Sequence, residues 1–288
     1  MGKTEMIYLR EQALLKKNFR KMNLAISDYT FANVFLFRDT YRYQLLGTPC
    51  GTFISAHNRH NENYIMPLLD LRTCNPLKLK DLIAENSFFF PIPEEWLSFF
   101  PADEFIATYD EGESDYIYLT ENLALFQGRQ FVRHRNHLNQ FFSSYKPSEQ
   151  PLSSANKADC LHILQIWQEE SGRKQNETDF AQCEEALLHF SSLALRGTIY
   201  YIDNQSAGFV IGEELNDNTF CLHFAKASKK YHGIYEFMFN DSAKRLAAQY
   251  KFMNLEEDMG NKNLRRTKAS YGPEILLKKY RVHLRKNI

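Results

Sequence analysis

Two carboxylates and an amide alternate in the stretch that precedes a strongly basic segment of the chain. If residues 251–258 form a β-strand, Asn254, Glu256 and Asp258 lie on one face, because successive side chains of a strand point to opposite faces. Converging carboxylates suit general-base chemistry, in which one of them accepts a proton from an amine. The spacing therefore predicts catalytic roles for Glu256 and Asp258, with Asn254 binding the ligand beside them.

Basic side chains follow this acidic stretch at once. A glycine-containing turn ends the predicted strand, and Arg265, Arg266 and Lys268 come next. Arg265 and Lys268 would hold an anionic group beside the predicted base. Alternatively, these cations pair with Glu256 and Asp258 at a solvated edge, because structural ion pairs also bring carboxylates and bases together. The sequence leaves both interpretations open.

A second basic group belongs to the helix predicted for residues 128–145. Arg129, Arg133 and His137 recur every four residues and therefore share one face of that helix. A phosphate or an RNA backbone would dock on such a face. A basic helix that covers the acidic region 94–121 would need the same residues, so the pattern allows either role.

The charges of the chain balance, but they are segregated. The net charge is +0 and the pI is about 7.1, so the whole molecule has no field that attracts nucleic acid. Residues 226–286 contain 15 basic and 6 acidic side chains, whereas residues 94–121 contain 9 acidic and no basic ones. Either the basic segment binds a polyanion, or the two segments pair with each other.

Several strings of this sequence resemble a known family. They are NLEEDMG at 254–260, LRRTKASYGPE at 264–274, LLKKY at 276–280, SDYTFANVFLFRDTYRYQL at 27–45 and DYIYLTENLALFQGRQFVRHRNHLNQF at 115–141. Their order resembles that of uncharacterised bacterial proteins that are similar to the C-terminal domain of phosphatidylglycerol lysyltransferase. The resemblance implies two tandem GNAT-like acyltransferase domains with mixed α/β sheets. Relatives with this tandem architecture include the lysyltransferase itself and the Fem peptidyltransferases, which transfer an amino acid from aminoacyl-tRNA to an amine or hydroxyl group.

The resemblance also implies where the donor binds. In GNAT enzymes, backbone N–H groups of the loop before a helix bind the pyrophosphate of coenzyme A, and the equivalent loop here spans residues 226–235. Lys230, Gly233 and Tyr235 occupy the pattern's positions, with Tyr235 where a small residue is expected. Its side chain would crowd a pyrophosphate, whereas the longer channel of tRNA-dependent relatives would tolerate it. Lys226, Lys229 and Lys230 suit phosphates in either case, or they form a solubilising surface.

Helices and strands alternate in an α/β order. The prolines and serines of residues 146–158 predict a linker between an N-terminal domain, 1–145, and a C-terminal domain, 159–288. We expect helices at 9–19, 27–38, 76–85, 94–99, 128–145, 158–170, 179–195 and 233–250. Strands are expected at 41–46, 52–56, 63–68, 105–109, 116–119, 198–202, 207–213, 219–225 and 251–258. The resemblance selects the GNAT topology among those that this order permits.

Composition limits the number of hydrophobic cores, the location of the protein and the kinds of metal or disulfide site that we expect. With 288 residues, 44% of them hydrophobic, the chain has enough apolar side chains for one or two cores. No signal peptide or membrane segment is predicted, so we expect a cytoplasmic protein. The five cysteines form no CxxC pair, which predicts reduced thiols and no metal site. Residues 57–60 contain two histidines but are expected to form a polar loop. His223 is expected to be a buried core histidine with a hydrogen-bond partner.

These features together predict a transferase. An acyl or aminoacyl group would pass from acyl-CoA or aminoacyl-tRNA to an amine or hydroxyl acceptor, which is a small molecule, a lipid or a peptide. The sequence contains no GxSxG, GxxxxGK[ST], HExxH or GxGxxG motif, which argues against hydrolase, nucleotide-triphosphatase, zinc-protease and dinucleotide-binding functions. The alternative is a non-catalytic GNAT-like protein that binds a small anionic ligand or tRNA.

Overall fold

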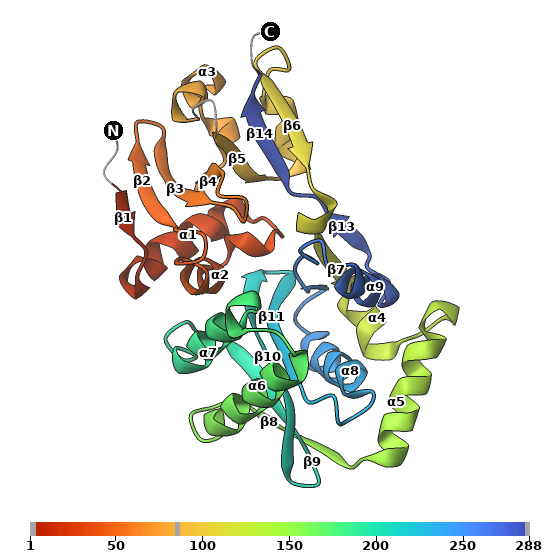
Figure 1. Ribbon diagram of the computed structural model, residues 1–288. Coiled ribbons are helices and arrows are strands. Elements are labelled where there is room, and N and C mark those ends of the chain that lie inside the picture. The colour runs from red at the N-terminus through yellow and green to blue at the C-terminus, as the bar shows by residue number, and fades with distance from the viewer. Residues whose placement is uncertain (1–3, 84–86, 286–288) are drawn as a thin grey trace. The chain divides into compact units, whose positions relative to one another are not determined.

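The computed structural model describes residues 4–83 and 87–285, which form two compact units (Figure 1). The first unit contains the chain up to residue 115, together with 257–262 and the residues from 276 onwards. The second unit contains 116–256 and 263–275. The C-terminal part of the chain therefore contributes to both units.

The first unit is built on a seven-stranded sheet, in the order β1-β2-β3-β4-β5-β14-β6. These strands are β1 (Thr4–Met6), β2 (Gln44–Thr48), β3 (Gly51–His57), β4 (Asn63–Pro67), β5 (Ser87–Ile92), β14 (Tyr280–Leu284) and β6 (Phe105–Tyr109). Its helices are α1 (Gln12–Met22), α2 (Phe31–Leu36) and α3 (Pro76–Leu79). Strand β14, from the end of the chain, pairs antiparallel with both β5 and β6. The last strand thus fills an interior position of the N-terminal sheet.

The start of α2 differs from the prediction. Residues Ser27–Tyr29 form a 3-10 turn, and the helix begins at Phe31. Thr30 is its N-cap, because its hydroxyl accepts a hydrogen bond from the backbone N–H of Asn33 at 3.2 Å. Ser27 instead donates its hydroxyl and its N–H to the buried carboxylate of Asp115. Its side chain is therefore not available to cap the helix.

The second unit is built on another seven-stranded sheet, in the order β13-β7-β12-β11-β10-β9-β8. These strands are β13 (Ile275–Leu277), β7 (Asp115–Leu119), β12 (Phe252–Asn254), β11 (Thr219–Ala227), β10 (Gln205–Asn216), β9 (Arg196–Ile202) and β8 (Pro147–Pro151). Its helices are α4 (Thr120–Leu125), α5 (Val132–Ser144), α6 (Lys157–Ser171), α7 (Phe180–Leu188), α8 (Ile234–Leu246) and α9 (Lys262–Ser270). Helices α6 and α8 both pack on β10 and β11, and α4 and α5 pack on α8. Aromatic side chains dominate this core, as in the stacked rings of Phe141 and Phe237 at 4.9 Å.

The units have other bounds than the predicted domains, 1–145 and 159–288. Strand β7 and helices α4 and α5, all placed in the N-terminal domain by the sequence, belong to the second unit. The predicted linker contains β8, which pairs antiparallel with β9 at the edge of the second sheet. Proline is tolerated in an edge strand, because one side of that strand forms no ladder. The prolines therefore mark an edge rather than a linker.

Each sheet is mixed. Strands β4 and β5 are parallel in the first sheet, and β11 and β12 are parallel in the second, whereas the neighbouring pairs β3–β4 and β10–β11 are antiparallel. Among the residues that the structure describes, no helix is long and apolar enough to cross a membrane. The parallel pair of the second sheet determines where the candidate site lies.

Candidate functional site

The site begins where β11 and β12 separate. Their pairing runs from Thr219 and Phe252 to Cys221 and Asn254, after which β11 continues to Ala227 while the other segment turns away. The carboxamide oxygen of Asn254 accepts a hydrogen bond from the N–H of Glu256 at 2.7 Å. This Asx turn ends the strand, and Glu256 has a positive φ of 59°. The predicted strand 251–258 is therefore wrong beyond Asn254.

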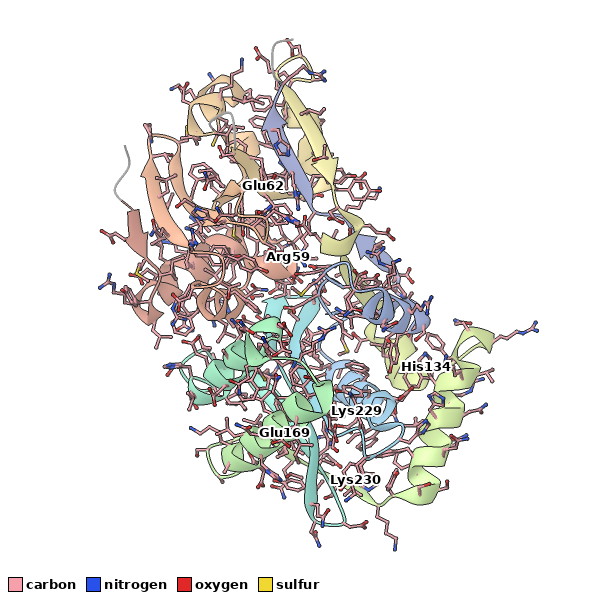
Figure 2. All side chains as sticks on the ribbon, viewed as in Figure 1. Arg59, Glu62, His134, Glu169, Lys229 and Lys230 are labelled. Carbon is pink, nitrogen blue, oxygen red and sulfur yellow. The ribbon has the colours of Figure 1, made fainter. Side chains whose placement is uncertain are left out.

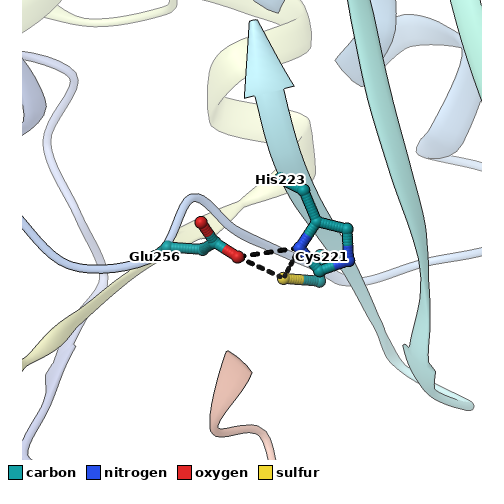
Figure 3. A group of neighbouring side chains, drawn as sticks. All are labelled: Cys221, His223 and Glu256. Carbon is teal, nitrogen blue, oxygen red and sulfur yellow. Dashed lines mark hydrogen bonds and ion pairs between the residues drawn. The ribbon is translucent and has the colours of Figure 1, made fainter. Parts of the chain in front are cut away.

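Glu256 meets two side chains of β11 at this point (Figure 3). One carboxylate oxygen lies 2.7 Å from Nδ1 of His223 and 3.8 Å from Sγ of Cys221. Cys221 Sγ is 3.7 Å from the same ring nitrogen. The other ring nitrogen of His223 lies 3.3 Å from a carboxylate oxygen of Glu213. We call Cys221, His223 and Glu256 the β11 cluster, with Glu213 behind it.

A β-bulge positions His223. Gly212 of β10 pairs with Leu222, and Ile211 pairs with Phe224, so His223 has no direct partner on β10. Bulges re-aim a side chain and are frequent beside functional sites. Gly212 is required here, because a Cβ atom at this position would come within 2.2 Å of the carbonyl oxygen of Cys221. The bulge and the glycine thus place the imidazole between two carboxylates.

The groups around this imidazole favour its protonated form. Burial by itself would lower the pKa of His223, but Cys221, Glu213 and Glu256 raise it well above its ordinary value. The imidazolium form can donate a hydrogen bond from each ring nitrogen to a carboxylate. The side chain of His223 is only 3% exposed, whereas that of Glu256 is 21% exposed. Glu256 is therefore the member of this pair that an incoming group can reach.

Asp258 has a different environment from that of Glu256. Its side chain is fully buried, and Oδ1 accepts a hydrogen bond from the N–H of Gly260 at 2.8 Å. This carboxylate thus helps to hold the turn that follows β12. By the division above, Asp258 belongs to the first unit and Glu256 to the second. Of the two carboxylates, only Glu256 therefore lies in the same unit as Cys221 and His223.

Lys268 and Arg265 come from α9. The ammonium group of Lys268 donates to the backbone carbonyls of Leu255 at 2.5 Å and Glu256 at 3.1 Å. It therefore fixes the segment after β12. Arg265 is half-buried on the same helix.

The loop predicted to bind the donor lies between β11 and α8, and several of its donor groups have partners within the protein. Lys226 is buried and donates to both oxygens of Asp179, at 2.6 and 2.8 Å, while its Nζ lies 3.7 Å above the ring of Trp167. The carboxylate of Glu170 accepts from the hydroxyl of Ser228 at 2.8 Å and from the N–H of Lys229 at 2.7 Å. A carboxylate thus holds this loop.

The rest of this loop is well packed. Gly233 has a φ of 85°, and a Cβ atom there would come within 2.9 Å of the carbonyl oxygen of His137. Tyr235 packs against the core of the unit, and burial raises its pKa to about 12. Lys229 and Lys230 are exposed (Figure 2), and Nζ of Lys230 lies 3.4 Å from the side-chain oxygen of Gln205. The lysines at 229 and 230 therefore face solvent, whereas Lys226 does not.

The basic face of α5 is used in part by the fold. Nδ1 of His137 lies 2.7 Å from the carboxylate of Glu236 on α8, and Nδ1 of the buried His134 lies 3.8 Å from it. Burial would raise the pKa of Glu236, but the two histidines lower it to about 2. Arg133 is exposed. On the predicted phosphate-binding face, His137 is thus paired with Glu236, whereas Arg133 faces solvent.

The acidic and basic segments pair with each other inside the first unit. Arg281 forms two hydrogen bonds with Glu113, Lys279 lies 3.0 Å from Asp115, and the hydroxyl of Tyr280 donates to Glu94. All three partners belong to the acidic stretch 94–121. For these residues the internal-pairing interpretation is confirmed.

Sequence reasoning found Glu256 but missed its partners. Cys221 and His223 are two residues apart in a predicted strand and therefore lie on the same face of it. This spacing was the only indication in the sequence that the two side chains could act together. Glu213 pairs with Cys221 across the β10–β11 ladder, and Asn254 pairs with Cys221 on the other side. These partners became visible only with the strand register, which the sequence did not supply.

Comparison with known proteins gives one family. A family model described as "Phosphatidylglycerol lysyltransferase, C-terminal" matches residues 19–283. The solved structure of a conserved protein of unknown function from Bacteroides thetaiotaomicron is 25% identical, with a TM-score of 0.88 over 99% of this chain and 100% of its own. The structure of L-PGS from Bacillus licheniformis is 14% identical, with a TM-score of 0.60 over 95% of this chain and 91% of its own. The latter likeness concerns the fold alone.

A sequence relative is also similar. The uncharacterized protein MYCGA3080 from Mycoplasmoides gallisepticum is 25% identical over 179 residues, which are 60% of this chain and 56% of that protein. The chain thus matches little more than half the length of this relative. The predicted resemblance and the predicted fold class, mixed α/β sheets of GNAT-like type, are both confirmed.

Proposed function

Because the chain belongs to the phosphatidylglycerol lysyltransferase C-terminal family, we propose that it transfers an aminoacyl group from aminoacyl-tRNA to an amine or hydroxyl acceptor. Family and fold support a function of the acyl- or aminoacyl-transferase kind. The carboxylate of Glu256, held by buried His223 where two parallel strands part, is the observation that carries the proposal. The acceptor is a lipid, a peptide or a small molecule.

The choice of donor rests on the loop between β11 and α8. The loop that would bind a pyrophosphate already binds a carboxylate, because the hydroxyl of Ser228 and the N–H of Lys229 both donate to Glu170. Displacing that carboxylate costs two charge-assisted hydrogen bonds, and a nearby negative charge opposes the phosphates. Tyr235 adds bulk at the same loop. These contacts favour aminoacyl-tRNA over acyl-CoA as the donor.

The reaction needs one proton acceptor. The acceptor amine attacks the ester carbonyl of the donor, so a carbon–nitrogen bond forms and the bond from that carbon to the ribose oxygen breaks. Glu256 orients the amine and accepts the proton that it loses, and the ribose oxygen leaves as a hydroxyl after taking a proton. His223 is a positioning residue, because its hydrogen bond fixes the carboxylate of Glu256.

A transfer assay tests this role. Purified protein is incubated with a pool of tRNA that carries radiolabelled amino acids and with a mixture of amine and hydroxyl acceptors. Replacing Glu256 by Gln should lower the rate of label transfer by about 10²–10⁴-fold, since the amide cannot accept the proton. Glu121→Gln, on an exposed side chain, serves as the control and should keep the wild-type rate.

Equal rates for wild type and Glu256→Gln, with both proteins folded by circular dichroism, would contradict the role of Glu256. Absence of label transfer by wild-type protein to any acceptor class would contradict the proposed function itself. Binding of the labelled tRNA without transfer would then favour a non-catalytic tRNA-binding protein.

A further inference from the structure

The geometry points to a metal site: we propose that Cys221, His223 and Glu256 bind one Zn²⁺ ion and that its binding switches the proposed transfer off. The three side chains offer a sulfur, a nitrogen and an oxygen, all within 4.8 Å of one another (Figure 3). They come from β11 and from the Asx turn after β12, so the sheet itself holds them. Thiolate, imidazole and carboxylate are the three ligand types that zinc accepts in proteins.

The distances fit a tetrahedral ion. Bonds of about 2.3 Å to sulfur and about 2.0–2.1 Å to nitrogen or oxygen put tetrahedral S···N and S···O neighbours about 3.5 Å apart, and N···O neighbours about 3.3 Å apart. The observed S···N and S···O distances are 3.7 and 3.8 Å. The N···O distance is 2.7 Å, because these atoms share a hydrogen bond. Replacing that hydrogen bond by an ion requires only a small outward movement of Glu256, whose side chain is 21% exposed.

The surroundings also suit zinc. A histidine that binds a metal commonly donates its other ring N–H to a carboxylate, which fixes the orientation of the ring. Here Nε2 of His223 lies 3.3 Å from the buried carboxylate of Glu213. Cys221 binds as the thiolate and His223 binds as the neutral imidazole through Nδ1, so both residues release a proton to solvent when the ion binds. Three protein ligands leave a fourth tetrahedral position for water.

Zinc would inhibit transfer because Glu256 is both a zinc ligand and the residue that accepts the amine proton. This inhibition rests on the proposed function. When Zn²⁺ coordinates Glu256, the oxygen that would accept the amine proton is occupied by the ion. Zinc and transfer therefore compete for the same carboxylate. Zinc binding itself depends only on the geometry of the β11 cluster, so the two claims can fail separately.

Cobalt substitution tests the binding claim directly. Co²⁺ added to the metal-free, reduced protein should bind one ion per chain and give visible bands of a tetrahedral site with a thiolate-to-cobalt absorption in the near ultraviolet. Added Zn²⁺ should displace it, and Mg²⁺ should not, because hard cations avoid thiolate ligands. Zinc affinity is then measured by competition with a chelator.

Variants locate the ion. Cys221→Ser should remove the thiolate absorption, whereas Cys74→Ser, on a half-buried cysteine elsewhere, should leave it unchanged. Glu213→Gln should keep the absorption but weaken zinc binding by about 10–100-fold, as expected of a carboxylate behind the histidine. A thiolate band that persists in Cys221→Ser, or its absence from folded wild-type protein, would overturn the site.

The transfer assay tests the regulatory claim. Saturating Zn²⁺ should abolish label transfer by wild-type protein, and a chelator should restore it. Full transfer by zinc-loaded protein would overturn the inhibition while leaving the site intact. Cobalt binding in a protein that transfers no label under any condition would instead contradict the proposed function and leave the metal site standing.

Discussion

At the residue scale, the buried side chain of Lys279 forms ion pairs with three acidic residues. Nζ of Lys279 lies 2.8 Å from Asp28, 3.0 Å from Asp115 and 3.0 Å from Glu257, all within the first unit. Burial is the main reason that the pKa of Asp28 is raised to about 7. The charge of Lys279 acts in the opposite direction, and the charges of Glu257 and Asp115 add to the rise. The ammonium group of Lys279 thus lies beside three carboxyl groups, and the fold favours the protonated form of Asp28.

This protonation makes stability depend on pH. A carboxyl group whose pKa is raised by folding contributes stability that is complete below its unfolded pKa, about 4, and is lost as the pH rises through its folded pKa. Between pH 4 and 7, the free energy of unfolding of the wild type should therefore fall relative to Asp28→Asn by up to about 1.4 kcal/mol per pH unit. Urea unfolding across this range measures it.

Asp39→Asn is the matched control, because the side chain of Asp39 is 74% exposed. Its unfolding free energy should follow that of the wild type at every pH. Identical pH profiles for wild type and Asp28→Asn would show that Asp28 is already ionised across this range.

At the scale of elements, helix α6 holds the loop between β11 and α8 in place. Glu170 of α6 receives the hydroxyl of Ser228 and the N–H of Lys229, so α6 and the loop are locked together. Hydrogen bonds to a charged group typically contribute about 1.5–3 kcal/mol each in a protein. The loop therefore owes its conformation to a side chain outside it.

Replacing Glu170 by Ala should lower the free energy of unfolding by about 2–4 kcal/mol, since two charge-assisted hydrogen bonds are lost. Chemical denaturation measures the change. Glu169→Ala, at the exposed neighbouring position labelled in Figure 2, should stay within about 0.5 kcal/mol of wild type. Equal losses for both variants would refute a specific role of the Glu170 carboxylate.

Sequence patterns predicted regular elements better than the site. Strand 219–225 and helix 233–250 correspond to β11 and α8, because apolar periodicity survives in both. The strand ending at Asp258 failed, since the carboxamide of Asn254 bonds to the backbone and ends β12 early. His223 was read as a core residue, and it is buried; only the ladder shows that it faces Glu213 and Glu256.

At the scale of the whole molecule, the end of the chain completes the first sheet. Strand β14 lies between β5 and β6, and Lys279 precedes it. The sequence predicted one domain after another, because periodicity along a chain carries no information about a strand that returns. The N-terminal sheet thus depends on residues from the C-terminal part of the sequence.

Lys279→Met should therefore destabilise the protein by about 3–5 kcal/mol, because it removes the buried ammonium group that lies beside the carboxyl groups of Asp28, Asp115 and Glu257. Calorimetric and urea unfolding measure the loss. Lys278→Met, at the neighbouring position above the ring of Tyr109, should change stability by less than about 1 kcal/mol. A stable Lys279→Met variant would contradict the structural role of this charge cluster.

The central claim is that this chain moves aminoacyl groups, and a competition between donors tests it most directly. Wild-type protein receives acetyl-coenzyme A and an aminoacyl-tRNA pool together, with phosphatidylglycerol vesicles and peptide amines as acceptors, and mass spectrometry identifies the products. We predict acceptors that carry amino-acid masses and that are absent with Glu256→Gln. Acetylated acceptors would contradict the donor, and unmodified acceptors throughout would contradict the transfer itself.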